Sequence, residues 1–356
     1  MENRDRTSGA QIHILSWPLL AIVVTVLCPV VGCGKEPTNA PVAQPSTTGN
    51  KKNTAVTGGS STVTASDLDD IKKAGQPYKI LLIVKTLNNP FFKPMVSAFK
   101  QAAAELGVHG DVQAAPQETD VDKQAALVQN AAAQGYKAIC ITPADSKALV
   151  PALKSAADKG VLIINVDNRL DKDAVNAAGL DLGGYVGADN EQGGKLAGQA
   201  MDLALEGKGN VVVIEGIRGV DNAEARKRGF ETAVKGKLTI LDERPADWTT
   251  EKAQNVMINL LALHPDIHGV FCANDEMAIG AIKAIKAYRP PGHISVVSYD
   301  NIKEVRPYLK SHELYATIEQ HPDLMGAESL RLAVAVLDGK AAKGNDLLVS
   351  LETITK

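Results

Sequence analysis

The chain has 356 residues, of which 45% are hydrophobic and 22% charged, so it is long enough to bury a large core and to form two domains. Its net charge of −3 at pH 7 and its pI near 6.2 give no electrostatic reason to expect nucleic acid as a partner. Aromatic residues make up only 4% of the chain, so an aromatic residue beside a polar cluster is informative.

The N-terminal 32 residues carry the pattern of an export signal. Two arginines precede the mostly apolar stretch Trp17–Val31, which is short for a membrane-spanning helix and suits the core of a secretion signal. The ending Val30-Val31-Gly32-Cys33 resembles the bacterial lipoprotein signal, in which Cys33 would be acylated and become the first mature residue. Two acidic residues offset the arginines, which departs from that pattern, and an uncleaved membrane anchor is the alternative. In either case we expect the rest of the chain to lie outside the cytoplasm.

Residues 33–75 are predicted to be a flexible tether. The part from Gly34 to Ala65 is rich in Thr, Ser, Asn, Gly and Pro and contains no aromatic residue, so it cannot bury enough apolar surface to offset its ordering entropy. Further along, Cys140 and Cys272 lie in apolar, strand-like runs. We interpret both as ordinary buried thiols rather than a disulfide, because the sequence shows no paired cysteine framework.

From Tyr78 onward, short apolar runs alternate with amphipathic stretches, which predicts βαβ units and parallel sheets. The expected strands are Ile80–Val84, Ala138–Ile141, Val161–Val166, Val211–Glu215, Leu238–Leu241, Val270–Cys272, Ile294–Ser298 and Tyr315–Ile318. The expected helices are Pro94–Leu106, Val121–Gln134, Ala223–Val234, Glu251–Leu263 and Glu276–Ala287. The pattern runs once to about Ala188 and starts again after Asp189, so we expect two similar α/β lobes.

Polar and aromatic residues follow these strands, at the edge where open α/β sheets bind ligands. Both blocks place carboxylates, amides, an arginine and an aromatic residue there, so two facing edges would enclose a cleft. Hydrogen-bonding groups beside aromatic faces suit a ligand with both hydroxyls and C–H faces, which describes a sugar. The candidates in the first block are Lys85, Asn89, Phe91, Phe92, Asp167 and Asn168, and in the second Arg226, Trp248, Asn274, Asp300 and Gln320.

Nine segments, in order and at matching spacing, resemble the ribose- and allose-binding proteins of the type I periplasmic solute-binding family. They are KTLNNPFF, ITPADSKAL, INVDNRLD, ADNEQGGKLAG, EARKRGF, RPADW, FCANDEMAIGA, VVSYDN and ATIEQHPD. The resemblance implies two Rossmann-like lobes with parallel sheets, joined by a three-strand hinge and closing over a monosaccharide. On this basis we expect a first lobe of residues 76–188 plus about 321–349, and a second of 189–320 plus about 350–356.

The resemblance also assigns roles to the candidates. Asn89, Phe91, Phe92 and Asp167 match first-lobe sugar contacts, and Arg226, Trp248, Asn274, Asp300 and Gln320 match second-lobe and hinge contacts. Lys85 matches a lysine of the allose-binding branch. Thr142 and Asn168 depart from the ribose binders, which carry an asparagine and an arginine there; Arg169 could stand in for the arginine only after a one-residue shift. These features favour a pyranose of the allose or psicose kind over ribose.

Structural roles are the alternative for several of these residues. Asp145, Asp189 and Asp275 each open a helical stretch and are expected to cap it. Phe91 and Phe92 could simply belong to the core, and Arg226 could lie on a solvated face. The histidines lack metal-ligand spacing, so we expect neither a metal nor a cofactor.

Three rival functions remain besides transport. An enzyme acting on a sugar is disfavoured, because the chain contains no P-loop, H-E-x-x-H or nucleophile elbow. The effector domain of a repressor would need a basic helix-turn-helix where the signal and tether lie. A binding protein that reports to a chemoreceptor or sensor kinase is not distinguished from a transport protein. We therefore expect a monomeric, non-catalytic, lipid-anchored protein that binds a monosaccharide and delivers it to the permease of an ABC importer.

Overall fold

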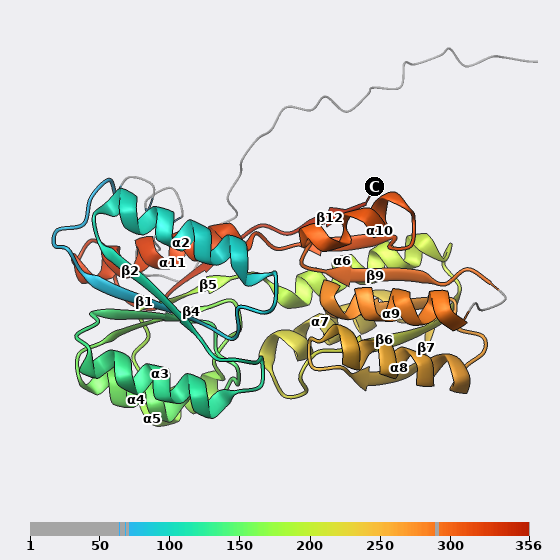
Figure 1. The fold of residues 1–356 in the computed structure, drawn as a ribbon, viewed down its shortest axis with the longest axis horizontal. Coiled ribbons are helices and arrows are strands. Elements are labelled where there is room, and N and C mark those ends of the chain that lie inside the picture. Colours follow the sequence, from blue (N-terminus) through green and yellow to red (C-terminus); the bar gives the residue numbers. More distant parts are fainter. Residues whose placement is uncertain (1–63, 65–67, 69–70, 289–291, 356) are drawn as a thin grey trace, which may run out of the picture. The chain divides into compact units, whose positions relative to one another are not determined.

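The computed structural model describes residues 64, 68, 71–288 and 292–355, which all belong to one compact unit. The export signal, Cys33 and most of the expected tether lie outside the described residues. Within the described part of the chain, the strands form two six-stranded sheets, and each sheet with its helices makes one lobe (Figure 1).

The first lobe is built on a sheet of order β11-β5-β4-β3-β1-β2, in which every pairing is parallel. Its strands are β1 (Lys79–Val84), β2 (His109–Ala114), β3 (Ala138–Ile141), β4 (Leu162–Val166), β5 (Gly184–Gly187) and β11 (Asn345–Leu348). Its helices are α2 (Phe92–Leu106), α3 (Val121–Ala133), α4 (Val150–Asp158), α5 (Lys172–Ala178) and α11 (Pro322–Leu337). Helices α2 and α11 lie on one face of the sheet, and α3, α4 and α5 lie on the other (Figure 1).

The second lobe is built on a sheet of order β12-β10-β9-β8-β6-β7. Its strands are β6 (Gly209–Glu215), β7 (Leu238–Pro245), β8 (Gly269–Cys272), β9 (Ser295–Tyr299), β10 (Ala316–Glu319) and β12 (Glu352–Ile354). Its helices are α6 (Asn190–Ala204), α7 (Asp221–Val234), α8 (Thr250–Leu263), α9 (Asp275–Tyr288), α10 (Arg306–Lys310) and the 3₁₀ turn η1 (Lys303–Val305). The last strand, β12, pairs antiparallel with β10, which the expectation of purely parallel sheets did not include.

The described chain passes between the two sheets three times: from β5 to α6, from β10 to α11, and from β11 to β12. The segment after β10 therefore returns to the first lobe, where α11 packs against α2. These crossings bring the carboxyl ends of both sets of parallel strands toward each other.

Strand β1 shows why the apolar runs form strands of this kind. All residues of the run Ile80–Val84 are buried, so the strand is covered on both faces as its sequence predicts. Ile80 and Leu82 belong to the same core cluster as residues of α2 and α11, whereas Leu81 and Ile83 pack with α3 and α4. Alternate side chains of β1 therefore pack into two separate layers of the core, one on each face of the sheet.

The strands that the sequence reading missed are short or polar. Strand β2, with sequence HGDVQA, contains no fully buried residue, and β5 is the four-residue segment GYVG. Neither strand has an apolar run, and the prediction of strands was based on such runs. Cys140 and Cys272 are buried, and neither forms a disulfide within the described residues.

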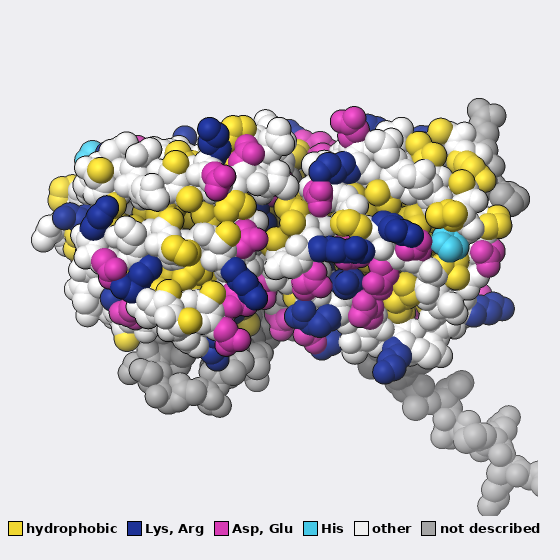
Figure 2. Space-filling view, turned by 90° about the horizontal axis from the view of Figure 1, so that it is seen from below, with side chains coloured by type: hydrophobic (Ala, Val, Ile, Leu, Met, Phe, Trp, Pro, Cys, Tyr) yellow, Lys and Arg dark blue, Asp and Glu magenta, His cyan; other side chains and the backbone are white. Residues whose placement is uncertain are grey.

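The surface carries charges of both signs. On the face shown in Figure 2, lysine and arginine side chains lie among aspartate and glutamate side chains over both lobes. Among the residues that the structure describes, none of the helices has the length and apolar character needed to cross a bilayer.

Candidate functional site

A small cavity, with about 250 Å³ of empty space that is partly open to solvent, lies between the carboxyl ends of the strands of the two lobes. The first lobe lines it with Lys85, Asn89, Phe91, Phe92, Glu118 and Asp167, and the second with Asn222, Arg226, Trp248, Asn274, Asp300 and Gln320. Every sugar-binding candidate from the sequence lines the cavity except Asn168. Glu118 and Asn222 also line it, although the sequence analysis did not select them.

Three of these residues have a positive φ, a backbone conformation that residues other than glycine rarely adopt. Asp167 follows β4 with φ of 61°, Asp300 follows β9 with φ of 112°, and Trp248 follows β7 with φ of 66°. Such conformations cost of order 1–3 kcal/mol each and cluster where binding requires a particular side-chain direction. The two aspartates occupy equivalent places, each directly after a central strand of its lobe.

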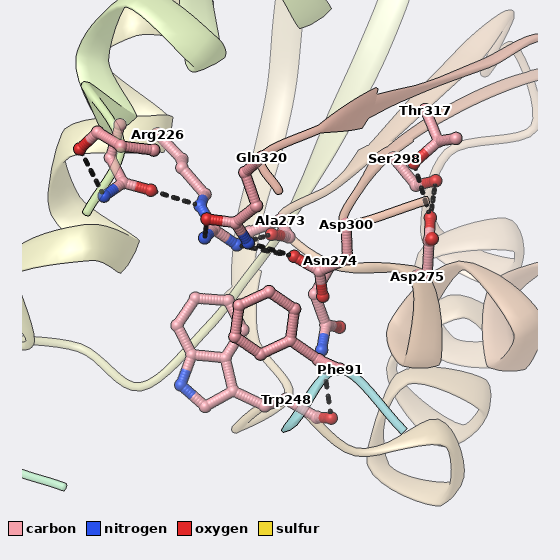
Figure 3. A network of polar contacts seen from close by, with 12 residues as sticks. Phe91, Arg226, Trp248, Ala273, Asn274, Asp275, Ser298, Asp300, Thr317 and Gln320 are labelled. Atoms are coloured by element: carbon pink, nitrogen blue, oxygen red, sulfur yellow. Dashed lines mark hydrogen bonds and ion pairs between the residues drawn. The ribbon is translucent and has the colours of Figure 1, made fainter. Parts of the chain in front are cut away.

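Arg226 is the centre of the polar network in the second lobe (Figure 3). Its Nε donates to Asn190 Oδ1 at 2.8 Å and its Nη1 to the carbonyl of Ala273 at 2.9 Å. Longer contacts of 3.5 Å and 3.3 Å join it to Asp300 Oδ1 and Gln320 Oε1. The guanidinium also lies 3.7 Å from the ring centroid of Tyr299. Arg226 is buried and held on several sides, so the alternative of a solvated face is wrong.

Glycines let two elements approach closely enough to place Arg226 and Trp248. A Cβ on Gly194 of α6 would lie 2.1 Å from the carbonyl oxygen of Arg226 on α7. A Cβ on Gly216 would lie 2.1 Å from the Trp248 ring. Gly194 belongs to the Gly193-Gly194 pair of the sequence, whose spacing is not that of a dinucleotide-binding motif. Its glycine is needed instead for helix packing.

Glu118 is a cavity residue that the sequence reading did not find. Its Oε1 accepts a hydrogen bond of 2.8 Å from Asn89 Nδ2, and Asn89 Oδ1 accepts one of 3.0 Å from the backbone N–H of Phe91. Burial raises the pKa of Glu118, and the positive charge of Lys85 opposes that rise. Glu118 follows the polar edge strand β2, which has no apolar run. It also lies outside the nine segments that resemble the sugar-binding proteins, so the sequence did not indicate it.

Aromatic side chains border the polar groups. Phe91 and Phe92 pack edge-to-face with their centroids 5.1 Å apart, and both are buried. Lys85 Nζ and the Arg226 guanidinium lie 5.7 Å and 5.6 Å from the centroid of the Trp248 ring. The two phenylalanines belong to the core and also line the cavity, so the two interpretations of them are compatible.

Several polar atoms of the cavity residues are buried without a hydrogen-bond partner among the described residues. They are Asp167 Oδ1, Asn222 Oδ1 and Trp248 Nε1. Buried polar atoms in native proteins are nearly always paired, and leaving one unpaired costs about 1–3 kcal/mol. Two acceptors and a donor are thus available to a ligand that itself both donates and accepts.

The buried carboxylates share one electrostatic feature. Burial raises the pKa of Asp167, and the charges of Lys85 and Arg226 partly offset this. Burial likewise raises the pKa of Asp300 well above its usual value, against the opposing charge of Arg226. Three carboxylates and two cations therefore line the cavity, which makes it a poor site for an anionic ligand.

Asn168 lies beside the cavity but uses its side chain elsewhere. Its Nδ2 donates to the carbonyl of Pro143 at 2.9 Å, and its Oδ1 accepts from the backbone N–H of Asn222 at 3.2 Å. Arg169 is also directed away, since it stacks on Tyr185 and pairs with Asp346 at 3.1 Å. Neither Asn168 nor Arg169 is among the residues that line the cavity.

One of the three expected helix caps is present, because Asp189 accepts from the N–H of Gln192 at the start of α6. Asp145 instead accepts from the N–H groups of Lys147 and Ala148 in the turn before α4, whose N-cap residue is Leu149. Asp275 is different: its carboxylate accepts from Thr317 Oγ1 and the N–H of Ile302, each at 2.8 Å, and from the Ser298 hydroxyl (Figure 3). Asp275 therefore ties α9 to β9, β10 and the loop that carries Asp300.

The described residues contain no cluster of three or more histidine, cysteine, aspartate or glutamate side chains placed to hold a metal ion. The groups around the cavity are hydrogen-bond donors, acceptors and aromatic faces. Such a site can bind and orient a small polyhydroxylated molecule.

Comparison with known proteins agrees with this geometry. A family model described as a periplasmic binding protein domain matches residues 80–341. The D-ribose/D-allose-binding protein of Pseudomonas aeruginosa is 34% identical over 265 residues, which cover 74% of this chain and 83% of that protein. The D-allose-binding periplasmic protein of Escherichia coli is 35% identical, with coverage of 71% and 82%.

A solved structure extends the likeness to three dimensions. The periplasmic solute-binding protein of an ABC transporter from Actinobacillus succinogenes, with bound D-allose, aligns with a TM-score of 0.74 and 37% identity. The alignment covers 78% of this chain and 98% of that protein. The fold is therefore the type I periplasmic binding protein fold, as predicted. The family consists of binding proteins, which confirms the prediction of a non-catalytic protein.

Proposed function

Because the chain belongs to the periplasmic binding protein family, we propose that it captures a single neutral monosaccharide between its lobes and delivers it to an ABC importer. The sugar class proposed is that of allose, psicose and ribose, with a pyranose preferred. The proposal for allose draws support from the sugars named for the relatives and from Lys85 and Trp248 at the cavity.

One observation carries the proposal of a sugar. The cavity brings together acceptors on Asp167 and Asn222 and a donor on Trp248, none of which has a partner in the described part of the chain, with the faces of buried aromatic rings. A sugar hydroxyl can donate to the acceptors and accept from the indole N–H, while its C–H faces cover the rings. Bonds to the charged groups Asp167, Asp300 and Arg226 are the stronger ones and would set the stereochemistry.

Calorimetric titration of the mature protein tests this proposal. The panel contains allose, psicose, ribose, xylose, galactose, a sugar alcohol and galacturonate. We expect at least one of the neutral sugars to bind and to raise the melting temperature. At a concentration of 100 Kd the sugar should add about 2.7 kcal/mol to the free energy of unfolding. Galacturonate is expected not to bind, because the cavity residues already carry more carboxylates than cations. Absence of binding by every neutral sugar at millimolar concentration would refute the proposal.

We further propose that the protein is exported and anchored to a membrane through an acylated Cys33. Support comes from the apolar run Trp17–Val31 and the Val-Val-Gly-Cys ending in the sequence. Expression of the full chain should yield a membrane-associated, palmitate-labelled product, and Cys33→Ser should lose the label. A labelled Cys33→Ser variant would contradict the anchor. Loss of uptake of the bound sugar on deletion of the gene, with restoration by the full chain, would separate transport from sensing.

A further inference from the structure

The first turn of α7 is capped by the opposite lobe. Its N-cap residue is Val220, whose side chain has no hydrogen-bonding atom, so the first N–H groups of the helix need partners from elsewhere. The N–H of Asp221 donates to Ser146 Oγ at 3.1 Å, and the N–H of Asn222 donates to Asn168 Oδ1 at 3.2 Å. Ser146 and Asn168 belong to the loops after β3 and β4 in the first lobe, whereas α7 belongs to the second.

The first lobe holds these two acceptors in place. Asn168 Nδ2 donates to the carbonyl of Pro143 at 2.9 Å and lies 3.5 Å from Ser146 Oγ. Asn165 braces the same loop, because its Nδ2 donates to the carbonyl of Asn168 at 2.8 Å and its Oδ1 accepts from the N–H of Leu170 at 2.9 Å. Both Ser146 and Asn168 are buried, so neither is a loosely held surface contact.

Helix α7 carries two residues that line the cavity, Asn222 and Arg226. On the opposite side, Asn168 directly follows Asp167, which also lines the cavity. The two caps therefore join the segments that would hold a sugar from either lobe, and they do so without belonging to the cavity lining themselves.

We propose that Ser146 and Asn168 are positioning residues that cap α7 across the cleft and favour the closed arrangement of the lobes. The inference rests on the proposed function, in which the lobes close around a sugar. If the lobes separate, the two N–H groups lose these partners and bind water instead. Each cap then contributes to the difference between closed and open forms, and the affinity for a ligand that binds the closed form follows that difference.

The expected effect on affinity is modest and independent of the sugar. Asn168→Ala should weaken binding about fivefold, which corresponds to about 1 kcal/mol and to the usual value of a helix cap. Ser146→Ala should have an effect of the same size and removes only one hydroxyl. Because neither residue lines the cavity, the ratio of affinities among different sugars should stay as in the wild type.

Two measurements test the proposal, with Asn130→Ala, an exposed asparagine on α3, as the matched control. The first is calorimetric titration with each sugar that binds the wild type. The second is the distance between spin labels at Asn176→Cys on α5 and Thr232→Cys on α7, both exposed positions, in the sugar-free protein. The native Cys140 and Cys272 are buried and should not be labelled.

We expect Asn168→Ala and Ser146→Ala to weaken the binding of all sugars by the same factor. In the sugar-free protein, the distance between the two spin labels should shift toward longer values. Unchanged affinity and distance would overturn the proposal, and so would a change that depends on the sugar, which would make Asn168 a direct contact. Should Asn168→Ala fail to fold, Ser146→Ala carries the test. Should no sugar bind the wild type, the proposed function fails, but the sugar-free distances still decide whether the caps hold the lobes together.

Discussion

Replacing Asp167 by asparagine should uncouple binding from stability. Asp167 is 2% exposed, and its Oδ1 has no hydrogen-bond partner among the described residues. Asparagine is one of the few residues that tolerate the left-handed backbone found here, with φ of 61°. Asp167→Asn should therefore keep the local conformation while it removes a buried carboxylate whose raised pKa records the cost of burying its charge.

The magnitudes follow from these contacts. The amide keeps a buried polar group at this place but removes the buried charge, and loss of the attraction to Lys85 and Arg226 offsets part of the gain. We expect the sugar-free melting temperature to stay unchanged or to rise by roughly 2–4 °C. Hydrogen bonds to charged groups contribute about 1.5–3 kcal/mol, so sugar affinity should fall about 10- to 150-fold.

Asp275→Ala is the matched control, because Asp275 is an equally buried carboxylate with internal partners. It accepts from Ser298, Thr317 and Ile302, and removal of its carboxylate leaves these donors unpaired. Its sugar-free melting temperature should fall by roughly 5 °C or more. Differential scanning calorimetry and titration calorimetry measure the two quantities for both variants. A marked loss of stability in Asp167→Asn, with sugar affinity intact, would refute the reasoning.

Three other predictions concern the same elements. Trp248 is the only tryptophan that follows the expected signal, and sugar binding should change its fluorescence; a silent titration with a sugar that binds by calorimetry would place the sugar elsewhere. Gly216→Ala should displace the Trp248 ring and weaken binding at least tenfold, and an unchanged Kd would contradict the close contact. Burial raises the pKa of Asp275 to about 7, so the folded state binds this proton more tightly than the unfolded state. Its contribution to stability is therefore present at low pH and is lost as the pH rises from about 4 to 7. Relative to Asp275→Asn, the wild type should lose up to a few kcal/mol of unfolding free energy over this range in urea titrations, and parallel pH profiles would disprove the assignment.

The sequence predicted the buried parallel strands well because their apolar runs are unbroken. Both ends of β1 and of β3 lie within one residue of the expected positions. The polar edge strand β2 and the Gly-containing β5 were missed, because their partners and not their own residues make them strands. The antiparallel β12 depends on pairing with β10, more than thirty residues away in the chain, which no local pattern indicates.

Some cavity residues were predicted because they follow a strand closely, and others, such as Arg226 on α7, were predicted from the resemblance. Asp167, Asn274 and Asp300 lie at the carboxyl ends of buried strands, so the chain order alone placed them at the cavity edge. Glu118 follows a strand that was not recognised, and Asn222 lies on a helix whose approach depends on packing. Their presence at the cavity is a property of the tertiary structure.

Asn168 and Asp275 show where the position of a residue in a motif does not determine its role. Each directly follows a cavity residue in the sequence, yet both use their side chains to satisfy backbone and hydroxyl groups of neighbouring elements. A polar group with internal partners gains little from a ligand, whereas one without partners gains a full hydrogen bond. Their neighbours at the cavity differ, because Asp167 Oδ1 and Asn222 Oδ1 have no partner among the residues that the structure describes. This division explains why the chain can retain costly unpaired atoms: the surrounding network prevents them from finding partners inside the protein, and a bound sugar would supply those partners.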